Sequence, residues 1–305
     1  MTQIVALLSW WEESPAWLTR CVSSIARFAD HLIAVDGAYQ HAPGAFTTPR
    51  SSGDQADVIA AAADAHGLGV TIHRPVAPWA GDEIEKRTFM FHAAALVAEP
   101  GRDWLFVIDA DEVVTEAPGS LRDRLDALAA AGAEVATVDL AELPERGACP
   151  ARRLFLADPT LRVEQAHYVY VAGPEHAPRF LWGDADVHEL APASHVGGFR
   201  IEHWSRLRAP ERRQVALDYY ERRDRYGLEQ ISRRRSPGEA PVWAFDPRPG
   251  SHTCAALVSP EEFSAIMERG YITLDGVRGR VVPEDCDEAA GFVRVYLDQP
   301  YAVPA

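Results

Sequence analysis

The first 145 residues alternate short apolar runs with segments of helical spacing, and this alternation strongly limits the folds open to the chain. The apolar runs, each long enough for a buried strand, lie at 4–10, 31–35, 70–73, 104–108 and 135–140. Helical patterns separate them, at 15–28, 54–66, 82–97 and 119–131. Strands that alternate with helices need crossover connections, which favour a mostly parallel sheet with helices on both faces. We therefore expect an α/β fold.

The pattern changes after residue 145. An extended segment over 161–171, a strand over 198–204 and a helix over 210–226 are expected, and the Pro- and Gly-rich stretch 235–250 is typical of a linker. A helix that begins at Ser259-Pro260 and short strands near 271–282 and 292–297 predict a small α+β appendage. We expect one domain over 1–234, with halves at 1–145 and 146–234, and the appendage over 251–305.

Composition and charge exclude several classes of protein. Hydrophobic residues make up 47% and charged residues 25% of the chain, which is typical of a globular protein and excludes a disordered one. The net charge of −15 disfavours general nucleic-acid binding. Residues 200–235, however, hold eleven arginines against six acidic residues. This basic segment predicts either a local anionic ligand or a solvated, ion-paired helix face.

The cysteines and the apolar runs bear on cellular setting. The four cysteines show no metal-binding spacing, which argues against a structural zinc site and a disulfide framework. The N-terminus lacks the basic region of a signal peptide, and no run approaches the ~20 apolar residues that span a membrane. We expect a cytoplasmic protein without a membrane span.

Two carboxylates, Asp109 and Asp111, follow the most apolar of the predicted strands. Parallel sheets bind ligands beyond the carboxyl ends of their strands. Two acids one residue apart repel each other unless a cation lies beside them, and Mg²⁺ or Mn²⁺ suits such oxygen ligands. The alternative is an acidic turn that merely joins the strand to a loop.

These features resemble the family 2 type of GT-A-fold nucleotide-sugar glycosyltransferases, over roughly residues 1–230. The resemblance rests on a strand at 4–9, the acidic Glu12-Glu13, a helix at 15–28, a strand that ends in Asp36-Gly37, and the Trp-initiated strand and acidic motif at 104–111. It implies a GT-A, Rossmann-like sheet. It also implies that Asp36 contacts the base or ribose, that Asp109 lies near the ribose and metal, and that Asp111 binds the metal.

The second half carries further parts of the same pattern, namely Arg179-Phe180-Leu181, Gly183, His188-Glu189 and the isolated His203. The resemblance implies that His203 is a third metal ligand. Guanidinium groups would neutralise the donor diphosphate, and the candidates are Arg179 and the Arg-rich segment with Arg206, Arg208, Arg212 and Arg213.

The helix over 82–97 carries Lys86, the only lysine of the chain, beside Arg87. By the same analogy, this helix lies near the phosphates or sugar of the donor. Lys86 would then pair with Asp109 or with phosphate. The alternative is an exposed pair with Glu83, which stabilises a helix by only a few tenths of a kcal/mol.

The resemblance implies an inverting, metal-dependent transfer of a sugar from a nucleoside-diphosphate sugar, with a UDP-sugar favoured. Inversion needs a carboxylate that takes a proton from the acceptor. Glu189 is our first choice and Asp186 the second, with Asp184 also open; Glu189 could instead form an ion pair with Arg179. The acceptor would be a hydroxyl of a polysaccharide, lipid or protein, or of a hydroxymethylated base in DNA.

Two other functions remain open on the sequence. A nucleotidyl- or phosphotransferase could use the same acidic strand end, although the chain lacks the Gly-x-x-x-x-Gly-Lys-Ser/Thr loop and the Gly-rich dinucleotide fingerprint. A catalytically inactive protein that binds sugar nucleotides is the third possibility. Retention of Asp109, Asp111, His188, Glu189 and His203 together argues against it.

Overall fold

The computed structural model describes most of the chain. The described residues are 2–40, 42, 44–45, 47–79, 82–143, 147–165, 169–183, 188–208, 210, 213–215, 219, 244–245, 253–274, 277–286, 288 and 291–298. Most of the helix expected over 210–226 lies outside them, as do Asp184, Asp186 and Arg212. Within the described residues, no helix is long and apolar enough to cross a membrane.

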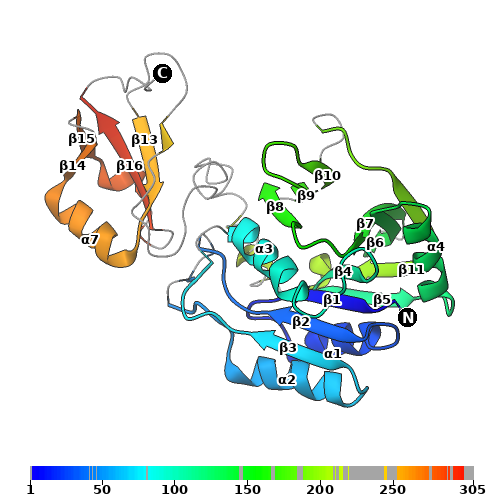
Figure 1. Ribbon diagram of the computed structural model, residues 1–305. Helices are drawn as coiled ribbons and strands as arrows, with labels where there is room; N and C mark the ends of the chain where they lie inside the picture. Colours follow the sequence, from blue (N-terminus) through cyan, green and yellow to red (C-terminus); the bar gives the residue numbers. More distant parts are fainter. Residues whose placement is uncertain are drawn as a thin grey trace.

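An eight-stranded sheet forms the core of the larger, N-terminal part of the molecule, in the order β3-β2-β1-β4-β7-β6-β11-β5 (Figure 1). Its strands are β1 (Ile4–Ser9), β2 (His31–Val35), β3 (Gly69–His73), β4 (Trp104–Asp109), β5 (Glu112–Glu116), β6 (Val135–Glu142), β7 (Ala148–Leu156) and β11 (Ala193–His203). Strands β3, β2, β1 and β4 run parallel, and so do β6 and β11. Strand β7 is antiparallel to β4 and β6, and β5 is antiparallel to β11. The expected α/β class with a mostly parallel sheet is confirmed.

Helices cover both faces of this sheet. On one face lie α1 (Pro15–Ile25), α2 (Gly53–Asp64) and α4 (Leu121–Ala130), which share one apolar core. On the other lies α3 (Asp82–Ala94), whose Met90 and Phe91 belong to a second core. Strand β1 alternates between the two cores, and all six of its residues are buried. A parallel strand covered on both faces needs the continuous apolar run that the sequence shows there.

A small antiparallel sheet, β10-β9-β8, covers the same face as α3. Its strands are β8 (Arg162–Gln165), β9 (Val169–Ala172) and β10 (Arg179–Trp182). The single extended segment expected over 161–171 is therefore wrong: β8 and β9 are separate strands that pair with each other. Strand β11 also begins earlier than expected, at Ala193. The sequence patterns do not predict strands β5 and β7.

The C-terminal residues form a second, five-stranded antiparallel sheet, in the order β12-β13-β16-β15-β14. Its elements are β12 (Ala244–Phe245), β13 (Thr253–Leu257), α7 (Pro260–Arg269), β14 (Tyr271–Leu274), β15 (Val277–Val281) and β16 (Phe292–Leu297). Helix α7 packs its Phe263 and Ile266 on one face of the sheet. Ser259 and Glu262 form a capping box at the start of α7, as the Ser-Pro signal predicts.

Candidate functional site

A cavity of about 310 Å³ opens where several parallel strands end. Ser9 ends β1, Gly37 follows β2, Asp109 ends β4 and His203 ends β11, and all four line the cavity. In a parallel sheet, the residues that directly follow the strands lie together at the carboxyl ends of the strands. Ligands of α/β sheets bind there. The other lining residues are Trp10, Trp11, Glu13, Tyr39, Ala42, Glu83, Lys86, Arg87, Ala110, Asp111, Ser205, Arg208, Val215 and Tyr219.

Asp109 is held by two arginines. Arg87 Nη2 donates to Asp109 Oδ1 at 2.8 Å, and Arg153 Nη1 lies 3.9 Å from Oδ2. Burial raises the pKa of Asp109, but the two guanidinium groups outweigh burial and bring the pKa below its ordinary value. Arg87 also donates from Nε to Glu83 Oε1 at 2.7 Å, which fixes the guanidinium against α3. Asp109 is therefore ionised and oriented.

Asp111 lies between His203 and Arg208. His203 Nε2 is 3.1 Å from Asp111 Oδ2, and Arg208 Nη1 is 3.3 Å from the same oxygen. Burial raises the pKa of Asp111, and the hydrogen bond with His203 and the charge of Arg208 more than offset it. The second ring nitrogen of His203, Nδ1, lies 2.6 Å from Glu142 Oε1. Burial opposes the charged imidazolium, but the carboxylates of Asp111 and Glu142 prevail and raise the pKa of His203 to about 10.

Beneath Asp109 and Asp111, Glu112 is fully buried. Its Oε2 accepts a hydrogen bond from the Asp109 backbone N–H at 2.9 Å, and its Oε1 accepts one from Arg153. Burial raises the pKa of Glu112 to about 7, even though the charge of Arg153 opposes the shift. Glu112, held by Arg153, thus fixes the backbone at Asp109.

Lys86 lies at the cavity wall with 1% of its surface exposed. Its Nζ donates to Trp10 O and to Gly37 O, each at 2.8 Å. The ammonium therefore ties the end of β1 to the loop after β2. The alternative of an exposed pair with Glu83 is wrong, because Lys86 and Glu83 are both buried, and the partner of Asp109 on α3 is Arg87.

The residue types around Asp111 fit a divalent cation. Carboxylate oxygens and an imidazole nitrogen are ligands that Mn²⁺ accepts. Within the described ranges, however, no three His, Cys, Asp or Glu side chains are arranged as a ready metal site. Each of the candidate donors has a protein partner: Asp109 contacts Arg87, and Asp111 and His203 contact each other. A metal ion would have to displace the Asp111–His203 contact and release the imidazolium proton.

Asp36 lies outside this cavity, with none of its surface exposed. Its carboxylate accepts hydrogen bonds from the backbone N–H groups of Gly37 and Ser51 and from the Ser51 hydroxyl, and it pairs with Arg74 at 3.3 Å. The structure therefore uses Asp36 to hold the loop after β2. A direct contact with base or ribose, as the resemblance implies, has no support in this placement.

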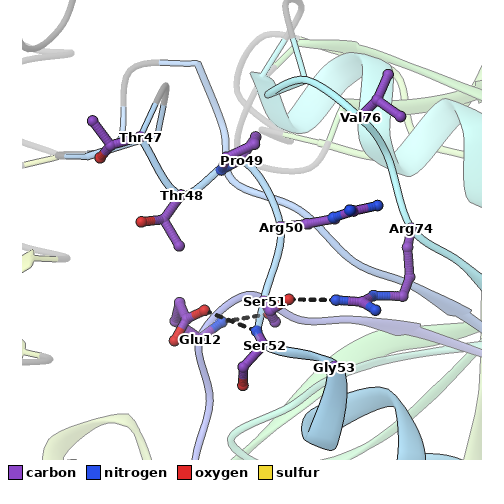
Figure 2. Close-up of a pocket in the computed structure, with 10 residues that line it drawn as sticks. All are labelled: Glu12, Thr47, Thr48, Pro49, Arg50, Ser51, Ser52, Gly53, Arg74 and Val76. Atoms are coloured by element: carbon purple, nitrogen blue, oxygen red, sulfur yellow. Dashed lines mark hydrogen bonds between the residues drawn. The ribbon is translucent and has the colours of Figure 1, made fainter.

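Arg74, the partner of Asp36, borders a second, open cavity of about 700 Å³ at the start of α2 (Figure 2). In Figure 2 Arg74 donates to Ser51 O, and the Glu12 backbone N–H donates to Ser51 Oγ. The Glu12 carboxylate accepts from the backbone N–H of Ser52, at the first turn of the helix. An acidic side chain of the protein thus occupies the positive end of α2.

Two residues expected at the site from the second half lie away from the cavity. Arg179 pairs with Glu134 at 2.8 Å and with Asp158 at 3.3 Å. Glu134 precedes β6, whereas Glu142 ends it beside His203, and eight residues of strand span about 26 Å. Arg179 is therefore at the opposite ends of these strands and does not reach the cavity. Glu189 is exposed and does not line the cavity, and the Arg179 pair that was its alternative does not form.

Among the described residues, the Arg-rich segment brings one of its expected arginines to the cavity. Arg206 is exposed and does not line the cavity, whereas Arg208 does. Arg208 donates from Nη2 to Glu13 and approaches Asp111 with Nη1. Asp186 and Arg212 are outside the described residues. Trp182, next to Gly183, packs against Phe155 and Tyr170 and does not line the cavity.

Arg153, Glu13 and Glu142 are among the site residues that sequence reasoning missed. Arg153 lies on β7, an unexpected strand, and its neighbours in sequence carry no motif. Glu13 belongs to the acidic pair after β1, and its burial beside Arg208 depends on a partner 195 residues away. The clustering of arginines after His203 is the one signal that pointed towards Arg208.

A scan against protein-family models finds no match to this chain, and no curated protein matches its sequence. The geometry of the cavity is therefore what supports a function.

Proposed function

We propose that this chain is a metal-dependent glycosyltransferase that moves a sugar from a nucleoside-diphosphate sugar to a hydroxyl acceptor. The observation that carries the proposal is the position of Asp109, Asp111 and His203. All three line one cavity at the carboxyl ends of β4 and β11, and basic side chains line the same cavity. A GT-A-like arrangement of the sheet belongs to this proposal.

The cavity offers partners for each part of a nucleotide sugar. Lys86, Arg87 and Arg208 bring positive charge to a buried site, where a diphosphate needs it. Trp11, Tyr39 and Tyr219 line the same space and contribute to one apolar cluster. Aromatic rings of this kind can stack on a base or a sugar. A volume of about 310 Å³ is within the range of small-ligand sites.

Asp111 and His203 are the residues that would hold the metal, with Asp109 beside them. A bound Mn²⁺ or Mg²⁺ would offset the charge that develops on the leaving diphosphate. Arg87 and Glu112 keep Asp109 in place through its carboxylate and its backbone N–H, respectively. Glu142 holds the other nitrogen of the His203 ring, so that Nε2 faces Asp111.

Inverting transfer also needs a carboxylate that accepts the proton of the attacking hydroxyl. Glu189 and Asp186 stay predictions for this role, although Glu189 does not line the cavity. We favour a UDP-sugar as the donor. The acceptor stays open among carbohydrate, lipid, protein and modified DNA.

Thermal unfolding tests the donor site. The protein would be heated with UDP, GDP, dTDP or CDP, each with and without Mn²⁺, as wild type, Asp111→Asn and Asp57→Asn. Asp57 is an exposed aspartate on α2 and serves as the matched control. A nucleotide at ~100 times its Kd should stabilise the native state by ~2.7 kcal/mol.

We expect one nucleotide to raise the unfolding temperature in the presence of Mn²⁺, in the wild type and in Asp57→Asn but not in Asp111→Asn. If no pair of nucleotide and metal shifts the transition, the donor site is refuted. If a nucleotide does bind, analysis of the products identifies the reaction. Glycosyl transfer releases a nucleoside diphosphate, whereas nucleotidyl transfer releases pyrophosphate or a sugar phosphate.

A further inference from the structure

One face of the C-terminal sheet carries a row of aromatic and basic side chains. Tyr271 on β14 pairs with Arg280 on β15, and Arg280 pairs with Tyr296 on β16. Residues opposite one another in neighbouring strands point to the same face. The row therefore reads Tyr–Arg–Tyr across three adjacent strands, over about 10 Å.

Two more arginines flank this row on the same face. Arg278 lies two residues from Arg280 on β15, and its guanidinium carbon is 4.3 Å from the centre of the Tyr271 ring. Arg294 lies two residues from Tyr296 on β16. Strand alternation puts the apolar residues between them, Gly279 and Val295, on the opposite face, where Val295 joins the core beneath α7.

The face is open to solvent on the side of β14 and β15. Tyr271 has 41% of its surface exposed, and Arg278 and Arg280 are both exposed. Tyr296 and Arg294 are half-buried. A solvated antiparallel face is usually polar, with scattered charges of both signs. This one instead carries two tyrosines and three arginines, with Thr273 and the buried Phe292 on the same face.

Acidic side chains border the row rather than interrupt it. The Tyr296 hydroxyl donates to Asp285, in the turn before β16. Asp298, directly after β16, is exposed, and its backbone N–H donates to Arg278 O. The positive charge is therefore concentrated on the strands themselves, although the whole chain carries −15.

We propose that this face of the C-terminal sheet binds single-stranded nucleic acid. The proposal goes beyond the glycosyltransferase function and does not depend on it. Phosphates of a strand that crosses the sheet would pair with Arg278, Arg280 and Arg294. Unpaired bases would stack on the exposed ring of Tyr271, because every base has a π-face that a tyrosine can cover.

The exposed tyrosine ring favours a single strand over a duplex. A duplex hides the faces of its bases within the stack and presents only their edges in its grooves. A tyrosine on the face of a sheet can meet base faces only where bases are unpaired. The negative charge elsewhere on the chain would also repel a long duplex more than a short strand on one face.

Fluorescence anisotropy of labelled 12-mers, titrated with the full chain, tests the proposal. The probes are oligo-dT, oligo-rU, a DNA duplex of the same length and a heparin fragment. The variants are Arg278→Ala with Arg280→Ala, Tyr271→Ala and Tyr271→Phe. Arg269→Ala is the matched control, because Arg269 is an exposed arginine at the end of α7, the helix that covers the other face of the sheet.

We expect the single strands to bind more tightly than the duplex. The double arginine variant should weaken binding at least tenfold and lower the slope of log K against log salt by about 1.4, since each lost phosphate contact removes about 0.7. Tyr271→Ala should weaken binding about fivefold or more, with Tyr271→Phe near wild type. Arg269→Ala should bind as the wild type does.

Three outcomes would overturn the proposal. The first is no binding of either oligonucleotide at about 50 mM salt, where phosphate contacts are strong. The second is an equal loss of affinity for the oligonucleotides in Arg269→Ala and in the double arginine variant, which would indicate general charge effects. The third is heparin binding as tight as that of oligo-dT together with no effect of Tyr271→Ala, which would make this face a site for an anionic polysaccharide.

Discussion

Arg208 Nη1 lies 3.3 Å from Asp111 Oδ2, so a guanidinium already neutralises the carboxylate that we propose as a metal ligand. The same guanidinium binds Glu13 through Nη2. Arg208 therefore competes with a metal ion for Asp111, but it is also well placed for a diphosphate. A metal that displaces the guanidinium would leave it free to pair with phosphate.

Arg208→Gln should consequently raise the affinity for Mn²⁺ alone and lower the affinity for the nucleotide in the presence of Mn²⁺. Mn²⁺ alone should bind several-fold more tightly, because its competitor for Asp111 is gone. The nucleotide in the presence of Mn²⁺ should bind about tenfold more weakly, since a charged hydrogen bond of about 1.5–3 kcal/mol is lost. Mn²⁺ titration followed by electron paramagnetic resonance, and calorimetry with the nucleotide, measure the two. Weaker binding of both would contradict the competition.

Lys86 should be a stability residue as well as a cavity residue. Lys86→Met removes the ammonium that donates to Trp10 O and Gly37 O. The two carbonyls, which lie near the cavity, then lack these hydrogen bonds. We expect a loss of about 2–4 kcal/mol in the free energy of unfolding, measured by urea denaturation. His92→Gln, an exposed change on the same helix, should stay within about 0.5 kcal/mol of wild type. Equal stabilities of Lys86→Met and wild type would show that the ammonium does not tie these segments.

The order of strands and helices in the first half could be predicted because its signals are local. Each helix of that half is indicated by its spacing of apolar residues, and β1, β2 and β4 are continuous apolar runs. Strand β7 has no such run, since its first three residues are exposed. It forms by pairing with β4 and β6, which are its neighbours in the sheet. Long-range pairing of this kind leaves little trace in a single sequence.

The same distinction separates the site residues. The sequence places Asp109 and His203 near strand ends, and strand ends meet at one edge of a parallel sheet. The partner of an arginine, in contrast, is decided by the tertiary structure. Arg179 binds Glu134, which is 45 residues away in the sequence, and Arg208 binds Glu13, which is 195 residues away. The spacing of arginines in the sequence therefore could not show which of them reaches the cavity.

Gly37 should tolerate no side chain. Its φ of +113° is rare for other residues, and an added Cβ would lie 2.5 Å from Pro75 Cγ and 2.8 Å from Trp79 Nε1. Gly37→Ala should cost about 2 kcal/mol or more of stability and weaken nucleotide binding, because Gly37 lines the cavity. Gly67→Ala is the matched control, with a φ of +66° and open space around it, and should cost about 1 kcal/mol without affecting binding. Equal costs of the two changes would mean that the loop after β2 yields to the added methyl group.

The four cysteines should react with a thiol reagent at very different rates. Cys149 is exposed, whereas Cys21 and Cys254 are buried. Burial raises the pKa of Cys254 to about 12, so its reactive thiolate stays scarce even in mild alkali. Near neutral pH we expect one fast equivalent in the native protein and reaction of all the cysteines after denaturation in guanidinium. Cys149→Ser should abolish the fast phase, whereas Cys254→Ser should leave it unchanged. A fast phase that Cys254→Ser removes would show that the core of the C-terminal sheet opens readily to solvent.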